Sequence, residues 1–351
     1  MRRPKRLVLG DTVALVNPAG MLPDRFARQL DYVKEYLGQM FKVKDHILYD
    51  NWADPKRRTE ALHRAFADQE VKAIFPLCGS DLIYEILPEL DYGLISQDPK
   101  ILVGSSSLSA LIMSIEEFAG LVTFYGPHMN FLNPKASWRE NNFTINSFWN
   151  MFLWDWHGKN SLNKNEAFHF FRAPKDEGGG IVVRNIYREP HRIKNANWRD
   201  NFYLTLTDKE SVSGVLTIGT LDALIPLCRY RPIVTSGKIF FLDALGKSLD
   251  ETFASFQELG TLIDLTKCST IVFSSITERG DQEKTMPELH DQFRVQEFLK
   301  DVSRQLGGAV PLLFGFPVGH CAYKLTLPAG IPATIKVASG EIVLHEIPHQ
   351  E

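Results

Sequence analysis

The first third of the chain alternates short apolar runs with segments of helical periodicity, and this alternation constrains the fold more than any other feature. The runs at 12–16, 41–43, 71–77 and 101–103 have the length and composition of strands. The segments 26–37 and 55–68 have helical spacing. A regular strand–helix–strand order is typical of a parallel, doubly wound sheet. The sequence therefore predicts an α/β fold for this part.

Three of the expected strands end in small or turn-forming residues. Residues 17–20 (Asn-Pro-Ala-Gly) follow the first strand, Gly79 and Ser80 follow the third, and residues 104–107 follow the fourth. In open parallel sheets, ligands bind at the carboxyl ends of the strands. We expect a functional site at this edge of the sheet.

The fourth strand leads through Gly104, Ser105, Ser106 and Ser107 into the apolar-periodic run 108–115. A sharp strand-to-helix turn of this kind can expose a serine Oγ beside the backbone N–H groups of the new helix. Ser106 is thus a candidate nucleophile. Two alternatives stay open: a serine that only caps the helix, and a loop that holds a phosphate at the helix N-terminus.

The strand–helix pattern stops at about residue 130, and the stretch up to residue 201 contains five of the six tryptophans. These rings could be packing filler or could form the wall of a substrate pocket, with Trp149, Trp154 and Trp156 as candidate binding residues. Beyond residue 202 the chain is rich in expected strands, with one clear helix at 248–262. We expect an N-terminal domain over 1–165, a connector over 166–201 and a C-terminal domain over 202–351.

Composition excludes several classes of protein. The net charge of −3 over 351 residues gives no electrostatic footprint for nucleic acid or an anionic membrane. No N-terminal apolar stretch has the length of a signal peptide or a membrane span, so a cytoplasmic protein is expected. The four cysteines are widely spaced, which predicts buried free thiols and neither a metal site nor a disulfide framework. No cofactor is expected.

Two residues of the C-terminal part could complete a catalytic group with Ser106. Asp243 directly follows the expected buried strand 239–242, and His320 lies in a Gly/Pro-rich loop after another apolar run. A serine hydroxyl needs an imidazole to remove its proton and a carboxylate to orient that imidazole. Taken singly, the aspartate could be a cap and the histidine a packing residue.

Several motifs occur in order along nearly the whole chain: Gly-Asp-Thr-Val-Ala-Leu-Val-Asn-Pro-Ala at 10–19, residues 75–92, residues 98–106, Gly-Leu-Val-Thr-Phe-Tyr-Gly-Pro at 120–127, and Pro-Val-Gly-His at 317–320. Together they resemble the LD-carboxypeptidase family of serine peptidases. The resemblance implies an N-terminal flavodoxin-like parallel sheet domain, a C-terminal strand-rich α/β domain, a homodimer, and a Ser–Glu–His triad without metal. One family branch trims D-alanine from murein tetrapeptides, and the other is the microcin C self-immunity branch.

The resemblance places Ser106 on the nucleophile, His320 on the general base and Asp243 on the glutamate. Gly79 falls on the first glycine of the oxyanion hole and Ser80 on the second, with the Ser107 N–H as the other donor. The chain departs from the family where Ser107 replaces aspartate, Ser80 replaces glycine and Asp243 replaces glutamate. Ala244 and the Ile-Gly-Thr-Leu run at 218–221 also differ from the family pattern.

The expected function is a serine hydrolase that cleaves an amide bond of a small peptide or peptidyl-nucleotide, as in antibiotic self-immunity and resistance. The tryptophan-rich stretch favours this branch because its rings could stack on a planar substrate. Two alternatives are a carboxypeptidase that removes the terminal D-alanine of a murein tetrapeptide, and a catalytically decayed protein that sequesters such a ligand.

Overall fold

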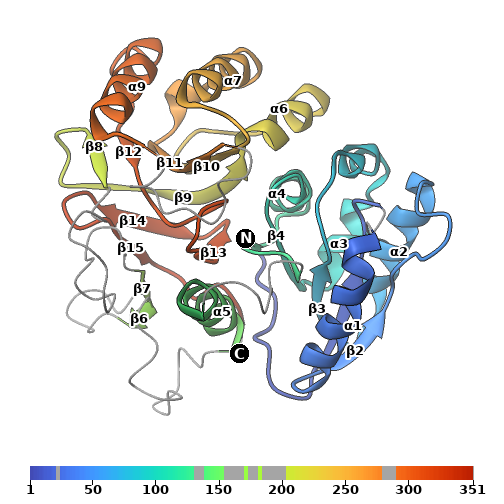
Figure 1. Ribbon diagram of the computed structural model, residues 1–351. Coiled ribbons are helices and arrows are strands. Elements are labelled where there is room, and N and C mark those ends of the chain that lie inside the picture. Colours follow the sequence, from blue (N-terminus) through green and yellow to red (C-terminus); the bar gives the residue numbers. More distant parts are fainter. Residues whose placement is uncertain are drawn as a thin grey trace. The chain divides into compact units, whose positions relative to one another are not determined.

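The computed structural model describes residues 1–20, 24–129, 138–153, 170–172, 181–183, 203–278 and 290–350 (Figure 1). The chain forms two compact units. Unit 1 comprises Met1–Trp154, Thr326–Gly330 and Pro348–Glu351, and unit 2 comprises Asp155–Leu325 and Ile331–Ile347. Two C-terminal segments therefore belong to unit 1. The domains expected from the sequence are each one continuous range, and those ranges place these segments in the C-terminal domain.

Unit 1 is built on a six-stranded sheet in the order β13-β5-β4-β3-β1-β2. Its strands are β1 (Thr12–Val16), β2 (Lys42–Asp45), β3 (Val71–Pro76), β4 (Ile101–Gly104), β5 (Thr123–Tyr125) and β13 (Leu327–Ala329). Its helices are α1 (Asp24–Gly38), α2 (Pro55–Ala67), α3 (Tyr92–Gln97), α4 (Leu108–Ala119) and α5 (Trp138–Leu153), with 3-10 helices η1 (Asp81–Glu85) and η2 (Leu87–Glu89). All neighbouring strands run parallel except β13, which is antiparallel to β5. The predicted doubly wound parallel sheet is confirmed.

The burial of these strands explains why their sequences are continuous apolar runs. Every residue of β1 and of β4 is buried, which is typical of a parallel sheet covered on both faces. Phe75 of β3 packs against Phe148 and Trp149 of α5, with ring centroids 5.8 and 6.1 Å away. The core of unit 1 thus packs α5 against the sheet whose strand ends carry the candidate site.

Unit 2 contains a nine-stranded sheet in the order β6-β7-β15-β14-β9-β10-β11-β12-β8. Its strands are β6 (Phe170–Arg172), β7 (Ile181–Val183), β8 (Leu204–Leu206), β9 (Ser211–Thr220), β10 (Lys238–Leu245), β11 (Thr270–Thr277), β12 (Leu312–Phe314), β14 (Pro332–Lys336) and β15 (Glu341–Leu344). Its helices are α6 (Leu221–Tyr230), α7 (Leu249–Leu262) and α9 (Gln292–Gln305), with the 3-10 helix η7 (Leu265–Lys267). Strands β9 to β12 are parallel and the flanking strands are antiparallel. The predicted strand-rich α/β domain is confirmed.

The helices of unit 2 differ from the single helix expected there. The expected helix is α7, which Ser248 and Glu251 begin with a reciprocal capping box. Helices α6 and α9 were not expected, and in Figure 1 they flank α7 in a row beside the parallel strands. Pro226 interrupts the helical pattern inside α6, whereas Asp291 caps α9 in the ordinary way. Within the described ranges, no helix combines the length and apolarity needed to cross a membrane.

Candidate active site

Ser106 lies in the turn between β4 and α4 of unit 1, and its backbone has the left-handed φ of +58°. This conformation is costly for a non-glycine residue, by about 1–2 kcal/mol, and such strain clusters at functional sites. Ser106 is half-buried, whereas Ser105 and Ser107 are buried. Its Oγ donates to no described acceptor. The turn therefore presents this serine, of the three, as the accessible hydroxyl.

The tightness of the turn depends on Gly104. A Cβ at this position would lie 2.8 Å from the Cβ of Leu108. One glycine is thus enough to let the first turn of α4 fold back on β4. The N-cap residue of α4 is Ser107, and its side chain makes no capping hydrogen bond. The structure therefore does not have the serine cap that the sequence left open.

Gly79 lies against this turn from the end of β3. A Cβ on Gly79 would be 2.6 Å from Ser107 Oγ, so a side chain here would require the Ser107 hydroxyl to move. Within the described part of the chain, the backbone N–H groups of Gly79, Ser80 and Ser107 donate to no protein acceptor. Backbone donors left open beside a candidate nucleophile are what an oxyanion hole requires. The structure brings the three predicted residues of that hole into one corner of unit 1.

Asp243 and His320 are in direct contact in unit 2. His320 Nδ1 lies 2.5 Å from Asp243 Oδ2, and both residues are 2% exposed. Because a carboxylate only accepts hydrogen bonds, Nδ1 carries the proton and the neutral ring has its lone pair on Nε2. Nε2 is buried and has no hydrogen-bond partner among the described residues. The pair has the geometry of a general base with its orienting acid.

Asp243 lies inside β10, and not directly after a strand as the sequence suggested. Its pairing with β11 shifts register between Leu242 and Ala244, and such an irregularity can re-aim a strand side chain. The shorter side chain of aspartate reaches the histidine because Gly319 approaches closely: a Cβ there would be 2.6 Å from Asp243 Cβ. The φ of +108° at Gly319 also requires glycine.

Two further residues hold this pair, and sequence reasoning missed both. Thr220 Oγ1, at the end of β9, donates to Asp243 Oδ1 over 2.8 Å. Ser275 Oγ of β11 accepts from the backbone N–H of His320 over 2.9 Å. Both residues lie on strands adjacent to β10, and residues at the same level of neighbouring parallel strands lie side by side. Their positions along these strands could therefore have indicated them as neighbours of Asp243.

Two domains of one known protein family match the two halves of this chain. Residues 13–126 match the LD-carboxypeptidase N-terminal domain, and residues 213–335 match the LD-carboxypeptidase C-terminal domain. A probable murein peptide carboxypeptidase of Bacillus subtilis is 35% identical over 350 residues, covering 97% of this chain and 94% of that protein. The chain belongs to the LD-carboxypeptidase family. It is accordingly a serine peptidase.

Two further proteins are similar to the chain over most or all of their length. The microcin C7 self-immunity protein MccF of Escherichia coli is 26% identical, covering 97% of this chain and 94% of that one. A structure of MccF in complex with aspartyl sulfamoyl adenosine has a TM-score of 0.73 at 21% identity, with both chains fully covered. The muramoyltetrapeptide carboxypeptidase of Oxalobacter formigenes has a TM-score of 0.65 at 19% identity, covering 95% of this chain and 97% of that one.

The candidate aromatic wall of this family member is described only in part. Trp149 lies in α5, 8% exposed, and its indole N–H donates to the Tyr36 hydroxyl over 2.7 Å. Phe41, Phe75 and Phe148 surround its ring. Packing therefore accounts for Trp149. Trp154 and Trp156 lie outside the described residues, as does the expected connector 166–201 apart from its two short strands.

All four cysteines are buried free thiols, as the sequence predicted. Burial raises the pKa of Cys78, beside the Gly79 corner, to about 11 and that of Cys268 to about 12. Both side chains are thus protonated thiols at neutral pH and are poor nucleophiles. In the described ranges no three His, Cys, Asp or Glu side chains gather as a metal site would require.

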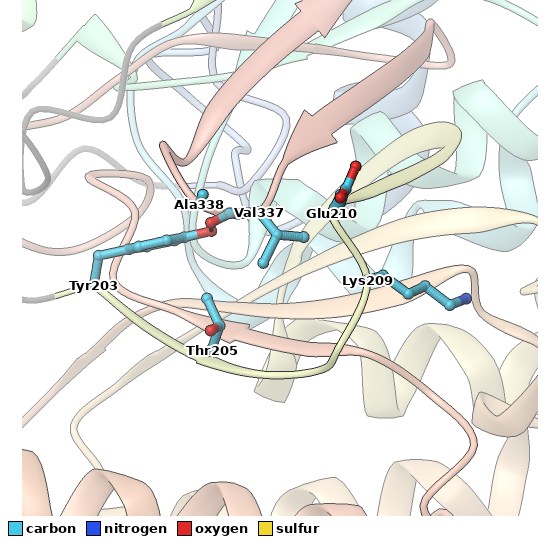
Figure 2. Close-up of a pocket in the computed structure, with 6 residues that line it drawn as sticks. All are labelled: Tyr203, Thr205, Lys209, Glu210, Val337 and Ala338. Atoms are coloured by element: carbon cyan, nitrogen blue, oxygen red, sulfur yellow. Dashed lines mark hydrogen bonds between the residues drawn. The ribbon is translucent and has the colours of Figure 1, made fainter.

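Unit 2 also contains a hollow of about 660 Å³ (Figure 2). It lies between the turn that joins β8 to β9 and the end of β14, and is lined by Tyr203, Thr205, Lys209, Glu210, Val337 and Ala338. The Tyr203 hydroxyl donates to the Val337 carbonyl over 2.9 Å. None of the predicted site residues that the structure describes lines this hollow, so it is separate from the Asp243–His320 pair.

Proposed function

We propose that the chain hydrolyses an amide bond with Ser106 as nucleophile, His320 as general base and Asp243 as the acid that orients it. The observation that carries the proposal is the Asp243–His320 hydrogen bond, which leaves Nε2 as a buried basic atom without a partner. The strained backbone of Ser106 supports it from the other unit. A role as a phosphate-binding loop would leave the aspartate–histidine pair unexplained.

The reaction follows the general serine-peptidase scheme. Ser106 Oγ attacks the scissile carbonyl while His320 Nε2 takes the hydroxyl proton, and Asp243 stabilises the imidazolium that forms. The N–H groups of Gly79 or Ser80 and of Ser107 hold the oxyanion. His320 then donates its proton to the leaving amine, and the acyl-enzyme is hydrolysed by a water that His320 activates in turn. Ser106 and His320 are regenerated.

The proposed substrate is a small peptidyl-nucleotide, as in self-immunity against a nucleotide-like antibiotic. Trp154 and Trp156, the two candidate stacking residues that packing does not already explain, support this, together with the aminoacyl sulfamoyl nucleosides named as ligands in MccF structures. A murein tetrapeptide is the second candidate. The murein tetrapeptide is favoured by the similarity to the probable murein peptide carboxypeptidase of Bacillus subtilis, which is 35% identical to this chain.

Two experiments test the proposal in order. A fluorophosphonate probe should label wild-type protein at Ser106, located by peptide mass spectrometry, and should not label Ser106→Ala. Absence of labelling would point to a protein that only sequesters its ligand. Mass spectrometry after incubation with aminoacyl sulfamoyl adenosines and, separately, with murein tetrapeptides then identifies the substrate class by the product formed.

Two expectations about the protein in its cell stay predictions. The family resemblance implies a homodimer, which light scattering coupled to gel filtration would detect as about twice the chain mass of 39.9 kDa. A cytoplasmic location is expected from the sequence, and cell fractionation tests it.

A further inference from the structure

Arg58 of α2 is a charged side chain with no exposed surface inside unit 1. Burying a guanidinium is costly unless its donors are matched by acceptors. Arg58 Nη1 donates to the Pro18 carbonyl over 3.1 Å and to the Leu82 carbonyl over 2.6 Å, and Nη2 pairs with Glu85, while the buried Nε has no hydrogen-bond partner among the described residues. One arginine therefore joins the turn after β1 to η1, the 3-10 helix that directly follows Gly79 and Ser80.

The same two segments are joined a second time. Ser80 Oγ donates to the Ala19 carbonyl and accepts from the Leu82 N–H, which caps η1. Gly20, at φ +89°, lets the turn lie directly on η1, since a Cβ there would be 2.5 Å from Leu82 Cδ1. The turn itself is anchored by Asn17, whose side-chain amide exchanges two hydrogen bonds with the Leu48 backbone. Gly79 and Ser80 thus precede a helix that is held to a fixed turn.

We infer that Arg58 is a positioning residue that fixes the Gly79–Ser80 backbone beside Ser107, so that its N–H groups point at the developing oxyanion. This rests on the proposed function, because it assigns those N–H groups to the oxyanion hole. The physical reason is that donors stabilise a transition state only when they are already in place, and a displacement of about 1 Å can cost about 100-fold in rate.

Lys100 provides a matched control in the same unit. It too is buried, and its Nζ donates to the Asp68 and Val71 carbonyls and to Asp98, over 2.7 to 2.8 Å. These acceptors lie at the amino end of β3 and just before β4, whereas the site residues follow the carboxyl ends of those strands. Both cations stabilise unit 1, but only Arg58 contacts the segment next to the proposed oxyanion hole.

The test measures two quantities on Arg58→Lys, Arg58→Met and Lys100→Met: the melting temperature and the rate constant for phosphonylation of Ser106 by a fluorophosphonate. Lysine at position 58 keeps the charge but cannot reach two carbonyls and a carboxylate in the same planar geometry. We expect all three variants to melt earlier than wild type. We expect phosphonylation to slow by about 100-fold in the Arg58 variants and to stay within about twofold in Lys100→Met.

A second readout does not depend on the probe. Amide hydrogen exchange at residues 79–85 should accelerate in Arg58→Lys and stay unchanged in Lys100→Met, at a temperature where both are folded. Wild-type phosphonylation rates in folded Arg58→Lys would overturn the inference and leave the proposed function standing. Failure of wild-type protein to react at Ser106 would overturn the proposed function itself, and the inference with it. If Arg58→Met does not fold, Arg58→Lys decides the inference by the same two readouts.

Discussion

The two units hold their candidate catalytic residues by different means. In unit 1 the backbone conformation positions the candidate nucleophile. Ser106 has a strained backbone, Gly104 and Gly79 permit close packing around it, and its side chain has no described hydrogen-bond partner. In unit 2 side-chain hydrogen bonds position the candidate base. Asp243 accepts hydrogen bonds from both Thr220 and His320, and Ser275 Oγ accepts one from the His320 backbone N–H. A nucleophile needs a free hydroxyl, whereas a general base needs one tautomer and one orientation. Changes of backbone conformation should therefore matter most in unit 1, and changes of hydrogen bonding in unit 2.

The largest effect is expected from Ser106→Ala. Loss of the nucleophile should lower turnover by about 10⁴- to 10⁶-fold, because the remaining machinery can act only on water. The melting temperature should change little, since alanine keeps the same backbone conformation and no side-chain hydrogen bond is lost. Ser105→Ala is the control and should keep its activity; retained turnover in Ser106→Ala would move the nucleophile to another residue.

Asp243→Asn should come next, with a loss of about 10⁴-fold in kcat and little change in KM. An asparagine amide can donate to Nδ1, which forces the proton of the neutral ring onto Nε2 and removes the base. Steady-state kinetics on the identified substrate measure both constants. Asp264→Asn, an exposed cap of η7 in the same unit, is the control and should retain kcat. A fall in substrate affinity alone would show that Asp243 binds substrate instead.

Gly319→Ala should lower kcat by about 100-fold, because the new Cβ would push His320 away from Asp243. Gly246→Ala is the matched control: its φ of +76° is also left-handed, but a Cβ there meets nothing within 4 Å. Both variants should lose stability from backbone strain, measured by thermal melting. Only Gly319→Ala should lose activity. Equal rates in the two variants would show that the close approach of Gly319 to Asp243 is not needed for catalysis.

Asp243→Glu should not improve the rate, although glutamate is the residue expected in this family. The site is already closed around aspartate, so an additional methylene crowds Gly319 and Ser275. We expect a loss of about 10-fold in kcat. A clear gain would mean that the native carboxylate is too short for its task.

The smallest effect, and the opposite sign, is expected for the stability of Ser106→Gly. Glycine removes a backbone strain of about 1–2 kcal/mol from the folded state. It also raises the entropy of the unfolded chain, which lowers the stability by about 0.5–1 kcal/mol. The free energy of unfolding should rise by up to about 1.5 kcal/mol while activity is lost, as chemical denaturation would measure. Ser105→Gly carries only the entropy cost and should be less stable than wild type. A destabilised Ser106→Gly would show that the strain is not stored at this residue.

The sequence predicted the parallel sheet of unit 1 because strands buried on both faces are continuous apolar runs, as in β1 and β4. It also predicted helix α7, whose capping box is local. Helices α6 and α9 escaped prediction, the first because Pro226 lies inside it. Packing against neighbouring strands and helices decides such cases more than local propensity does.

For the candidate site, the sequence alone determined which residues have reactive chemistry and that Ser106 lies in a strand-to-helix turn, because both follow from residue type and local pattern. Tertiary structure decided the rest. The direct Asp243–His320 bond requires residues 77 positions apart to meet, and it depends on the close approach of Gly319. The roles of Thr220, Ser275 and Arg58 likewise arise from contacts between segments distant in sequence, which no local pattern encodes.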